Sequence, residues 1–269
     1  MRIGSRDFAT TGHTYIMGIL NVTPDSFSDG GKFNQINAAL KHAEEMIGDG
    51  ADVIDIGGES TRPGYTKISD EEEIDRVVPV IEAVKKEFEI PISVDTYKSR
   101  VAEAAAQAGA DLINDIWGLK YDPHMAEVIA KSGLACCLMH NRDNTEYRNF
   151  MEDVKQDLRE TIVLAKAAKI ADDKIILDPG VGFAKSYENN LEVIRRLKEF
   201  NELKYPVLLG TSRKSVIGLT LDLPAAERVE GTIVTTVMAV EAGCMFVRVH
   251  DVKENHRAIQ MAEAILDRK

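Results

Sequence analysis

The sequence predicts an α/β protein of the (β/α)8 or TIM-barrel class, formed by a single domain over residues 1–269. Three observations lead to this prediction. Short apolar segments alternate with helical patterns, and about eight such units fit the length of the chain. Nearly every apolar segment ends in a polar or charged residue. Proline and glycine are scattered without a linker-like block, so nothing divides the chain into two domains.

The expected elements follow from hydrophobic periodicity. Eight short apolar segments are expected to be strands: residues 15–20, 53–56, 92–94, 112–113, 135–139, 175–177, 207–209 and 245–249. Segments with helical spacing lie between them: residues 36–47, 71–88, 99–108, 150–168, 191–200, 225–241 and 255–266. Glycine follows several of the helical segments, as at Gly109, Gly133 and Gly243, where it suits the left-handed end of a helix.

A doubly wound open sheet is the competing architecture, because the number of strands does not show whether the sheet closes. An open sheet gathers its functional residues at one crevice, whereas a barrel brings the C-terminal ends of all its strands to one mouth. Polar residues after nearly every strand therefore favour the barrel.

Composition and charge exclude several classes of protein. The 33 Lys and Arg against 44 Asp and Glu give a net charge of -11, which argues against nucleic acid or an anionic membrane as the main partner. The first twenty residues are too mixed for a signal peptide, and no apolar run is long enough to span a membrane, so we expect a cytoplasmic protein. Cys136, Cys137 and Cys244 lie in apolar segments and are expected to be core thiols.

Two polar loops follow the first two strands. Residues 21–31 begin with Asn21 and are rich in hydroxyl and carboxylate groups, as catalytic loops at strand ends often are. Residues 59–64 contain Arg62, whose planar guanidinium could bind a phosphate or a carboxylate. Taken alone, Arg62 is better explained as a surface arginine beside a turn proline than as a ligand-binding residue.

Three further side chains predict a binding site inside the mouth. Asp95 and Asp178 each end a buried strand, and Asn114 follows another. Together they suit a flat, nitrogen-rich heterocycle with an amidine-like N–H edge, because carboxylates pair well with such edges. Any one of these residues alone is better explained as the cap of the following helix than as a binding residue. The three together favour a binding site.

The last two strands end in cationic groups. Residues 210–215 bring hydroxyls, Arg213 and Lys214 to a strand-to-helix junction, where backbone N–H groups favour an anion. The spacing is not that of a P-loop. Arg248 and His250 alternate along the last strand and should project to the same side, near the usual phosphate position in barrels. Taken alone, this pair fits a solvated strand end equally well.

The collected motifs resemble those of the dihydropteroate synthase family. The resemblance rests on residues 21–31, 55–64, 178–183, 212–215 and 248–251, which span the chain in family order. It implies a transferase of folate biosynthesis that condenses 6-hydroxymethyl-7,8-dihydropterin diphosphate with 4-aminobenzoate, with Mg²⁺ as cofactor. It also implies a homodimer formed on the side of the last helices, and sulfonamides as competitors of 4-aminobenzoate.

The resemblance also implies residue roles. Around the pterin it implies Asp95, Asn114, Met139, Asp178, Phe183, Lys214 and Arg248. Around the diphosphate it implies Asn21, Arg62, Arg248 and His250, with Asn21 closest to the metal. For 4-aminobenzoate it implies Thr61, Pro63, Lys214 and Ser215, with the carboxylate near the helix that begins around Ser215. The implied catalytic residues are Asp29, Arg62, Lys214, Arg248 and His250.

The mechanism that we expect is a dissociative, SN1-like substitution. Its barrier falls if positive charge on the pterin and negative charge on the leaving diphosphate are both stabilised. Asp95 and Asp178 suit the first task, with Asp29 near the developing cation, and the cationic groups with Mg²⁺ suit the second. Two departures from the family pattern affect only loops: residues 139–144 differ from a common Met-x-Gly type sequence, and Ala184 stands where glycine is common.

Two rival functions stay open from the sequence. A methyltetrahydrofolate-corrinoid methyltransferase domain would share the pterin site, but it binds no diphosphate and would have no use for Arg62, Lys214, Arg248 and His250. A non-catalytic pterin-binding paralogue would be expected to lose the residues of the two loops first, yet Asp25, Asp29, Thr61 and Arg62 are present.

Overall fold

The structure is a computed structural model that describes residues 1–23, 32–59 and 67–268. Four residues to which the sequence assigns roles lie outside this part of the chain: Asp29, Thr61, Arg62 and Pro63.

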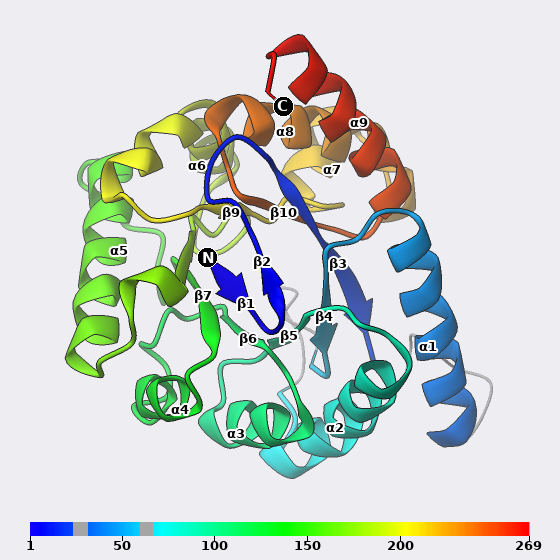
Figure 1. Cartoon of the computed structure of the whole chain (residues 1–269). Helices are drawn as coiled ribbons and strands as arrows, with labels where there is room; N and C mark the ends of the chain where they lie inside the picture. The colour runs from blue at the N-terminus through cyan, green and yellow to red at the C-terminus, as the bar shows by residue number, and fades with distance from the viewer. Residues whose placement is uncertain (24–31, 60–66, 269) are drawn as a thin grey trace.

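Eight parallel strands form the barrel (Figure 1). They are β3 (Tyr15–Asn21), β4 (Val53–Gly57), β5 (Ile92–Asp95), β6 (Leu112–Asp115), β7 (Ala135–Met139), β8 (Ile175–Asp178), β9 (Leu208–Leu209) and β10 (Phe246–Val249). Their order is β8-β7-β6-β5-β4-β3-β10-β9. A parallel bridge between Leu177 and Val207 joins the two ends, and the N–H of Leu177 donates to the carbonyl oxygen of Pro206 at 2.9 Å. The sheet is therefore closed, which confirms the barrel and excludes the open sheet.

Helices form a ring around the strands (Figure 1). They are α1 (Lys32–Gly48), α2 (Asp70–Glu87), α3 (Ser99–Ala108), α4 (Met125–Ser132), α5 (Phe150–Ala167), α6 (Tyr187–Arg195), α7 (Ser215–Leu221), α8 (Val229–Ala242) and α9 (Val252–Ile265), with 3-10 turns η2 (Asp172–Lys174), η3 (Leu197–Leu203) and η4 (Ala225–Glu227).

Several helices differ from the prediction: α1 and α9 begin earlier, α4 and α7 were not among the segments predicted from periodicity, and two further differences have a cause in the backbone. The helix expected over residues 191–200 is wrong as a single element, because α6 ends at Arg195 and η3 follows. The backbone of Arg196 leaves the helical conformation, with φ -104° and ψ 19°, and its guanidinium pairs with Glu192 and Glu199 on either side. The helix expected from residue 225 begins at Val229, because Arg228 has the same non-helical conformation.

A small hairpin covers the N-terminal end of the barrel. Its strands β1 (Arg2–Ile3) and β2 (Arg6–Asp7) pair antiparallel, and they cross the centre of the ring in Figure 1. Ile3 and Phe8 are buried in one apolar cluster with Met17, Leu208 and Phe246 from the strands. This end of the barrel is therefore apolar and closed, so polar chemistry can only occupy the opposite end.

Strand alternation separates the helix-facing residues from the interior. Ile54 and Ile56 on β4 belong to the large core between strands and helices, whereas Val53 belongs to the cluster under the hairpin. Asp55 lies two residues after Val53 on the same side of the strand and is fully buried. The interior thus changes from apolar to polar along the strands, and the polar half lies at their C-terminal ends.

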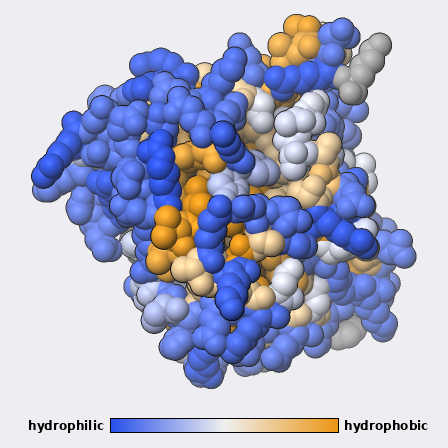
Figure 2. Space-filling model, turned by 60° about the vertical axis from the view of Figure 1, so that its left-hand side comes forward, coloured by the Kyte–Doolittle hydropathy of each residue, from blue (hydrophilic) through white to orange (hydrophobic). Residues whose placement is uncertain are grey.

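The three cysteines lie inside the fold. Cys136, Cys137 and Cys244 are buried free thiols, as predicted. None of the helices in the described ranges is long and apolar enough to cross a membrane. Hydrophilic residues cover most of the face shown in Figure 2, with hydrophobic residues gathered in a hollow near its centre.

Candidate active site

Polar side chains from six strands meet at the C-terminal end of the barrel. They are Asn21 from β3, Asp55 from β4, Asp95 from β5, Asn114 from β6, Asp178 from β8 and Arg248 from β10. Parallel strands in a closed sheet bring these ends together although the residues are far apart in the sequence. All but Asp55 were predicted as site residues.

Arg248 connects two buried carboxylates. Its Nε donates to Oδ2 of Asp55 at 2.6 Å, and its Nη2 donates to Oδ2 of Asp95 at 2.7 Å. Burial by itself would lower the pKa of Arg248, but the two carboxylates raise it above its ordinary value. Arg248 therefore carries a permanent positive charge between Asp55 and Asp95.

The same carboxylates keep acceptor atoms available for a ligand. Oδ1 of Asp55 and Oδ1 of Asp95 are buried and have no hydrogen-bond partner among the described residues, and Oγ of Ser93 is in the same situation. The pKa of Asp95 is raised to about 7. Burial is the largest cause, Arg248 opposes it, and Asp55 adds to it. Because buried acceptors without partners are costly, these atoms indicate a place for N–H donors of a ligand.

Asp178 and Lys214 form the other side of the site. Oδ1 of Asp178 accepts the backbone N–H of Gly180 at 2.7 Å. A Cβ atom on Gly210 would lie 3.6 Å from Oδ2 of Asp178 and 3.8 Å from Nζ of Lys214, so the glycine leaves room between the two groups. Burial raises the pKa of Asp178 and Lys214 lowers it. Burial also lowers the pKa of Lys214 to about 8, which Asp178 opposes.

Apolar rings border this polar group. Nζ of Lys214 lies 4.8 Å from the ring centroid of Phe183. Met139 forms a buried cluster with Tyr97 and Ile116, against which Trp117 and Phe183 pack. An apolar wall next to convergent acceptors and cations suits a flat heterocycle that has one polar edge.

The predicted anion groups lie at the ends of β9, β10 and β3. Oγ of Ser212 accepts the backbone N–H of His250 at 3.1 Å and lies 2.9 Å from its Nδ1. The hydroxyl hydrogen of Ser212 can then be donated to Nδ1, which fixes the orientation of the His250 ring. Asn21 is half-buried at the end of β3. Gly57 lies beside it, and a Cβ atom on this glycine would be 3.6 Å from Oδ1 of Asn21.

Ser215 begins helix α7 and is exposed. Lys214 is the N-cap residue of this helix, and no side chain caps the helix there. The helix start is therefore open to an anionic ligand, as the sequence predicted for this junction.

Two buried groups of the site were missed from the sequence. Asp55 lies inside β4 and not at its end, so a search for strand-end polar residues passes over it. Its position two residues before Gly57, on the inward side of the strand, could have identified it. Lys185 lies in the loop after β8, and its pKa is lowered by burial to about 7.

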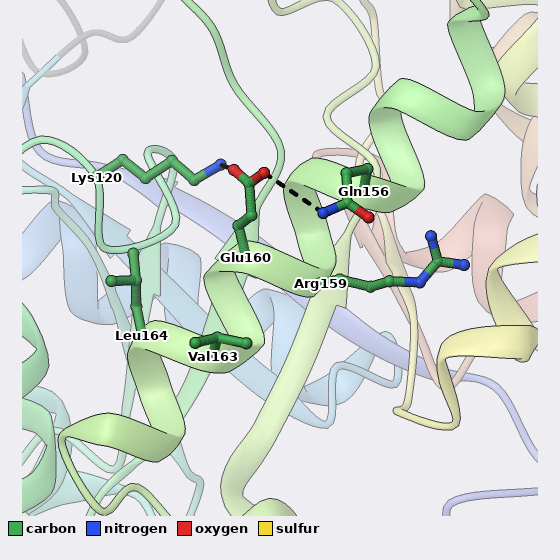
Figure 3. A pocket seen from close by; sticks show the side chains of 6 residues that line it. All are labelled: Lys120, Gln156, Arg159, Glu160, Val163 and Leu164. Atoms are coloured by element: carbon green, nitrogen blue, oxygen red, sulfur yellow. Dashed lines mark hydrogen bonds and ion pairs between the residues drawn. The ribbon is translucent and has the colours of Figure 1, made fainter.

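A second cavity lies outside the barrel and is not this site. It has a volume of about 400 Å³ and is lined by Lys120, Gln156, Arg159, Glu160, Val163 and Leu164 (Figure 3). Five of these residues belong to helix α5, and the cavity contains none of the groups at the barrel mouth.

The fold and the site together define a barrel enzyme that binds a flat, amidine-bearing heterocycle beside cationic groups. A sequence model of the family described as "Pterin binding enzyme" matches residues 17–250. The chain is 62% identical over 269 residues to a dihydropteroate synthase of Clostridium beijerinckii, with 100% of both chains covered. The chain therefore belongs to the pterin-binding enzymes and, among them, to the dihydropteroate synthase family.

Solved structures of high similarity agree. Dihydropteroate synthase from Clostridium difficile in the presence of pteroic acid is 52% identical, with a TM-score of 0.93 and 100% of each chain covered. The Yersinia pestis enzyme with a sulfonamide drug is 42% identical, with a TM-score of 0.93 and 99% of each chain covered. The Xanthomonas albilineans enzyme with 4-aminobenzoic acid is 40% identical, with a TM-score of 0.90, covering 94% of this chain and 93% of that one.

Proposed function

We propose that the described site carries out the reaction of the chain's family, in which 6-hydroxymethyl-7,8-dihydropterin diphosphate and 4-aminobenzoate give 7,8-dihydropteroate and diphosphate. The observation that carries the proposal is the set of buried carboxylate oxygens without partners, Oδ1 of Asp55 and Oδ1 of Asp95, beside the cations Arg248 and Lys214. Acceptors there suit the pterin, and cations suit the diphosphate. We also propose that the reaction occurs in the cytoplasm, as the sequence analysis predicts.

The pterin is proposed to bind with its N–H edge toward the carboxylates. Asp95 and Asp178 accept N–H donors of the ring, and Asn114, which is tied to Oδ2 of Asp55 at 3.3 Å, offers an amide oxygen and an amide N–H. Phe183 and Met139 provide the apolar contacts. The pteroic acid complex of the Clostridium difficile relative supports a pterin ligand for this fold.

Mg²⁺ is the cofactor that we propose. Across the described ranges, no three His, Cys, Asp or Glu side chains come together as a metal site. Mg²⁺ often has only one or two protein ligands and takes its others from water and substrate phosphates. The residues present therefore fit an ion held by Oδ1 of Asn21 and by the diphosphate. When bound, Mg²⁺ would neutralise charge on the leaving diphosphate.

The remaining charges are proposed to support a dissociative substitution. Asp95 and Asp178 stabilise positive charge that spreads over the pterin as the bond to diphosphate breaks. Arg248 and His250 face the negative charge of the leaving group, as does Arg62, which lies outside the described residues along with Asp29. The neutral aromatic amine then attacks the methylene carbon and loses its proton. No strong base is needed at that step.

The 4-aminobenzoate is proposed to bind near Lys214 and Ser215, with its carboxylate at the open start of helix α7. Thr61 and Pro63 complete this subsite by family resemblance and lie outside the described residues. The complexes of relatives with 4-aminobenzoic acid and with a sulfonamide drug support this ligand and these competitors.

A homodimer is proposed through the last helices. α7, α8 and α9 lie next to one another on one side of the ring (Figure 1). They carry exposed apolar side chains: Leu219, Leu221, Val234, Val237, Met261, Ile265 and, just after α9, Leu266. A set of this kind on adjacent helices suits an interface between identical subunits.

One assay tests the proposed reaction. The purified protein is given dihydropterin diphosphate, Mg²⁺ and 4-aminobenzoate, and pyrophosphate is measured with and without the amine. We expect release that depends on the amine and that a sulfonamide inhibits. Pyrophosphate formation that ignores 4-aminobenzoate would contradict the proposal, and methyl transfer to a corrinoid would establish the rival function instead. The names of the full-length relatives do not favour that rival.

A further inference from the structure

Lys185 has three acceptors around its ammonium group. Its Nζ donates to the carbonyl oxygen of Gly180 at 2.9 Å and to that of Phe183 at 3.1 Å. The third contact joins Nζ to Nδ1 of His140 at 2.8 Å. An ammonium has three N–H groups, so each one has a partner. Two of these partners lie in the loop after β8, which is the loop that carries Phe183 to the site.

The third partner is a histidine held in one tautomer. His140 follows β7, and its side chain is fully buried. Its Nε2 lies 2.9 Å from Oδ2 of Asp157 on α5, and that carboxylate also accepts Nε of Arg142 at 2.5 Å. A carboxylate paired in this way accepts hydrogen bonds, so Nε2 carries the proton and Nδ1 offers its lone pair to Lys185. Burial lowers the pKa of His140 to about 4, so the ring is neutral.

Other contacts show how closely this loop fits its surroundings. A Cβ on Gly180 would lie 2.0 Å from the carbonyl oxygen of His140, so the two backbones touch. The hydroxyl of Tyr147 donates to the carbonyl oxygen of Ala184 at 2.7 Å. Ala184 has φ 46°, a left-handed backbone conformation that glycine adopts more easily than alanine. Lys185 and Tyr147 therefore hold the same loop, one with a charge and one without.

Lys185 also acts on Asp178 through its charge. Lys214, Lys185 and Arg248 each lower the pKa of Asp178, against the burial that raises it. These cations come from three different segments, and the other titratable groups near the carboxylate are thiols, those of Cys137 and Cys244. Burial lowers the pKa of Lys185 to about 7, so Lys185 adds its positive charge next to Asp178 mainly below that pH.

We propose that Lys185 is a positioning residue of the pterin site, which fixes the loop that carries Phe183 and helps to keep the Asp178 carboxylate ionised. The inference rests on the proposed pterin role of Asp178 and Phe183. His140 and Asp157 serve Lys185 by presenting a fixed lone pair. Lys185 itself touches neither reacting group.

The test measures binding of pteroic acid to the full chain between pH 6 and 9, together with KM for each substrate. In Lys185→Met we expect about tenfold weaker binding at pH 6, where Lys185 of the wild type is charged, and a higher KM for dihydropterin diphosphate. KM for 4-aminobenzoate should stay within about twofold. Measured in an Asp95→Asn background, which removes the titration of Asp95 from this pH range, the pH at which binding is half lost should rise, because Asp178 loses a cation and its pKa increases.

Two matched variants separate charge from loop packing. Tyr147→Phe removes the uncharged tie to the same loop, and it should leave the pH midpoint of binding in place. Lys198→Met removes an exposed lysine on η3 and should change neither measurement. If Lys185→Met shifts the midpoint no more than Tyr147→Phe does, the charge role is overturned.

A third variant covers the case in which Lys185→Met does not fold. Lys185→Arg keeps the charge but cannot point three donors at the same acceptors, so it should raise KM for dihydropterin diphosphate and leave the pH midpoint unchanged. An unchanged KM in Lys185→Arg would overturn the positioning role. The wild-type chain must first show pyrophosphate release that depends on 4-aminobenzoate. If the wild type does not show it, the proposed function is contradicted. If the wild type shows it and the Lys185 variants bind and react like the wild type, only this inference is contradicted.

Discussion

Arg248 and Asp95 form an ion pair inside the barrel, with 2.7 Å between Nη2 and Oδ2, although 153 residues separate them in the sequence. The same guanidinium reaches Asp55 through Nε at 2.6 Å. Arg248 thereby uses two of its donors to hold two carboxylates from β5 and β4, and one oxygen of each carboxylate has no partner within the part of the chain that the structure describes. The protein itself thus partly neutralises the charge of the two carboxylates, and their remaining acceptors are held in fixed positions.

Replacing this arginine should cost both stability and activity. Arg248→Met leaves Asp55 and Asp95 buried together without their cation, and loss of one partner of a buried pair typically costs about 3–5 kcal/mol. We expect a loss of this size in the free energy of unfolding, measured with denaturant. We also expect kcat/KM to fall at least about 100-fold, as two site carboxylates lose their orientation.

A surface arginine provides the control for this change. Arg196 also pairs with two carboxylates, Glu192 and Glu199, but its side chain is 37% exposed. Arg196→Met should therefore cost no more than about 1 kcal/mol and should leave the reaction unchanged. Equal losses of stability in Arg248→Met and Arg196→Met would contradict the buried ion pair as described.

Asp178 should matter to pterin binding more than to folding. In Asp178→Asn the amide oxygen can still accept the N–H of Gly180, so the turn after β8 should persist. The ligand loses a charged acceptor, which is worth roughly 3 kcal/mol, and affinity for pteroic acid should fall about 100-fold by calorimetry.

The exposed carboxylate of Asp172 serves as a comparison for that variant. It lies in η2 on the surface and pairs with Lys166. Asp172→Asn should bind pteroic acid like the wild type. An affinity in Asp178→Asn within threefold of the wild type, with circular dichroism unchanged, would refute the role of Asp178.

Binding of the pterin should depend on pH through Asp95. Its pKa is raised by burial to about 7, so near neutral pH a large part of the free protein carries a proton on this group. N–H donors of the pterin favour the ionised form. Affinity for pteroic acid should therefore rise from pH 6 to pH 8, and binding at pH 7 should release a proton. Calorimetry in two buffers of different ionisation enthalpy measures that proton. In Asp95→Asn the release should largely disappear, and an unchanged release would assign it to another group.

Several of these residues were predictable because one rule of barrels finds them. Asp95, Asn114 and Asp178 end buried strands, and parallel strands in a closed sheet bring such ends together wherever they occur in the sequence. Closure itself needed the structure, since it depends on the bridge between Leu177 and Val207, which no local pattern encodes.

Other features have no local signal of this kind. The strands β1 and β2 have two residues each, too few for alternation to be seen, and their packing under the barrel depends on Ile3 and Phe8 meeting distant strands. Lys185 looks like an ordinary loop lysine until the fold brings His140, 45 residues earlier, within 2.8 Å of it. Such roles come from long-range contacts, and the sequence pattern around a residue does not contain them.

Acid should destabilise the protein through His140. In the folded chain its pKa is lowered to about 4, whereas about 6.5 is normal for an unfolded chain. Between these values the unfolded state binds the proton and the folded state does not, so stability is full above about pH 6.5 and falls as the pH drops toward 4. The share of His140 in this pH dependence should amount to about 3 kcal/mol, measured as the difference between wild type and His140→Gln in denaturant unfolding at several pH values, because the raised pKa of Asp95 acts in the opposite direction.

The pH window separates this effect from that of its partner. The pKa of Asp157 is lowered in the folded state, so its contribution is lost only below the ordinary pKa of an aspartate, about 3.9. His140→Gln can still accept from Lys185 and donate to Asp157, and it should remove the destabilisation toward acid that His140 contributes between pH 4.5 and 6.5. His42→Gln, on the half-exposed surface of α1, should not, and a slope that survives in His140→Gln would show that another group titrates.

The proposed dimer can be broken on one helix and tested against another. Met261 on α9 has 61% of its surface exposed in the single chain, and Val163 on α5 has 65% exposed. If α7, α8 and α9 form the interface, Met261→Asp buries a charge between subunits, and a charge without a partner strongly opposes burial. Light scattering after size exclusion should then give a dimer for the wild type and for Val163→Asp, and a monomer for Met261→Asp at micromolar concentration. A dimer in Met261→Asp together with a monomer in Val163→Asp would move the interface to the outer surface of α5, where Val163 borders the cavity of Figure 3.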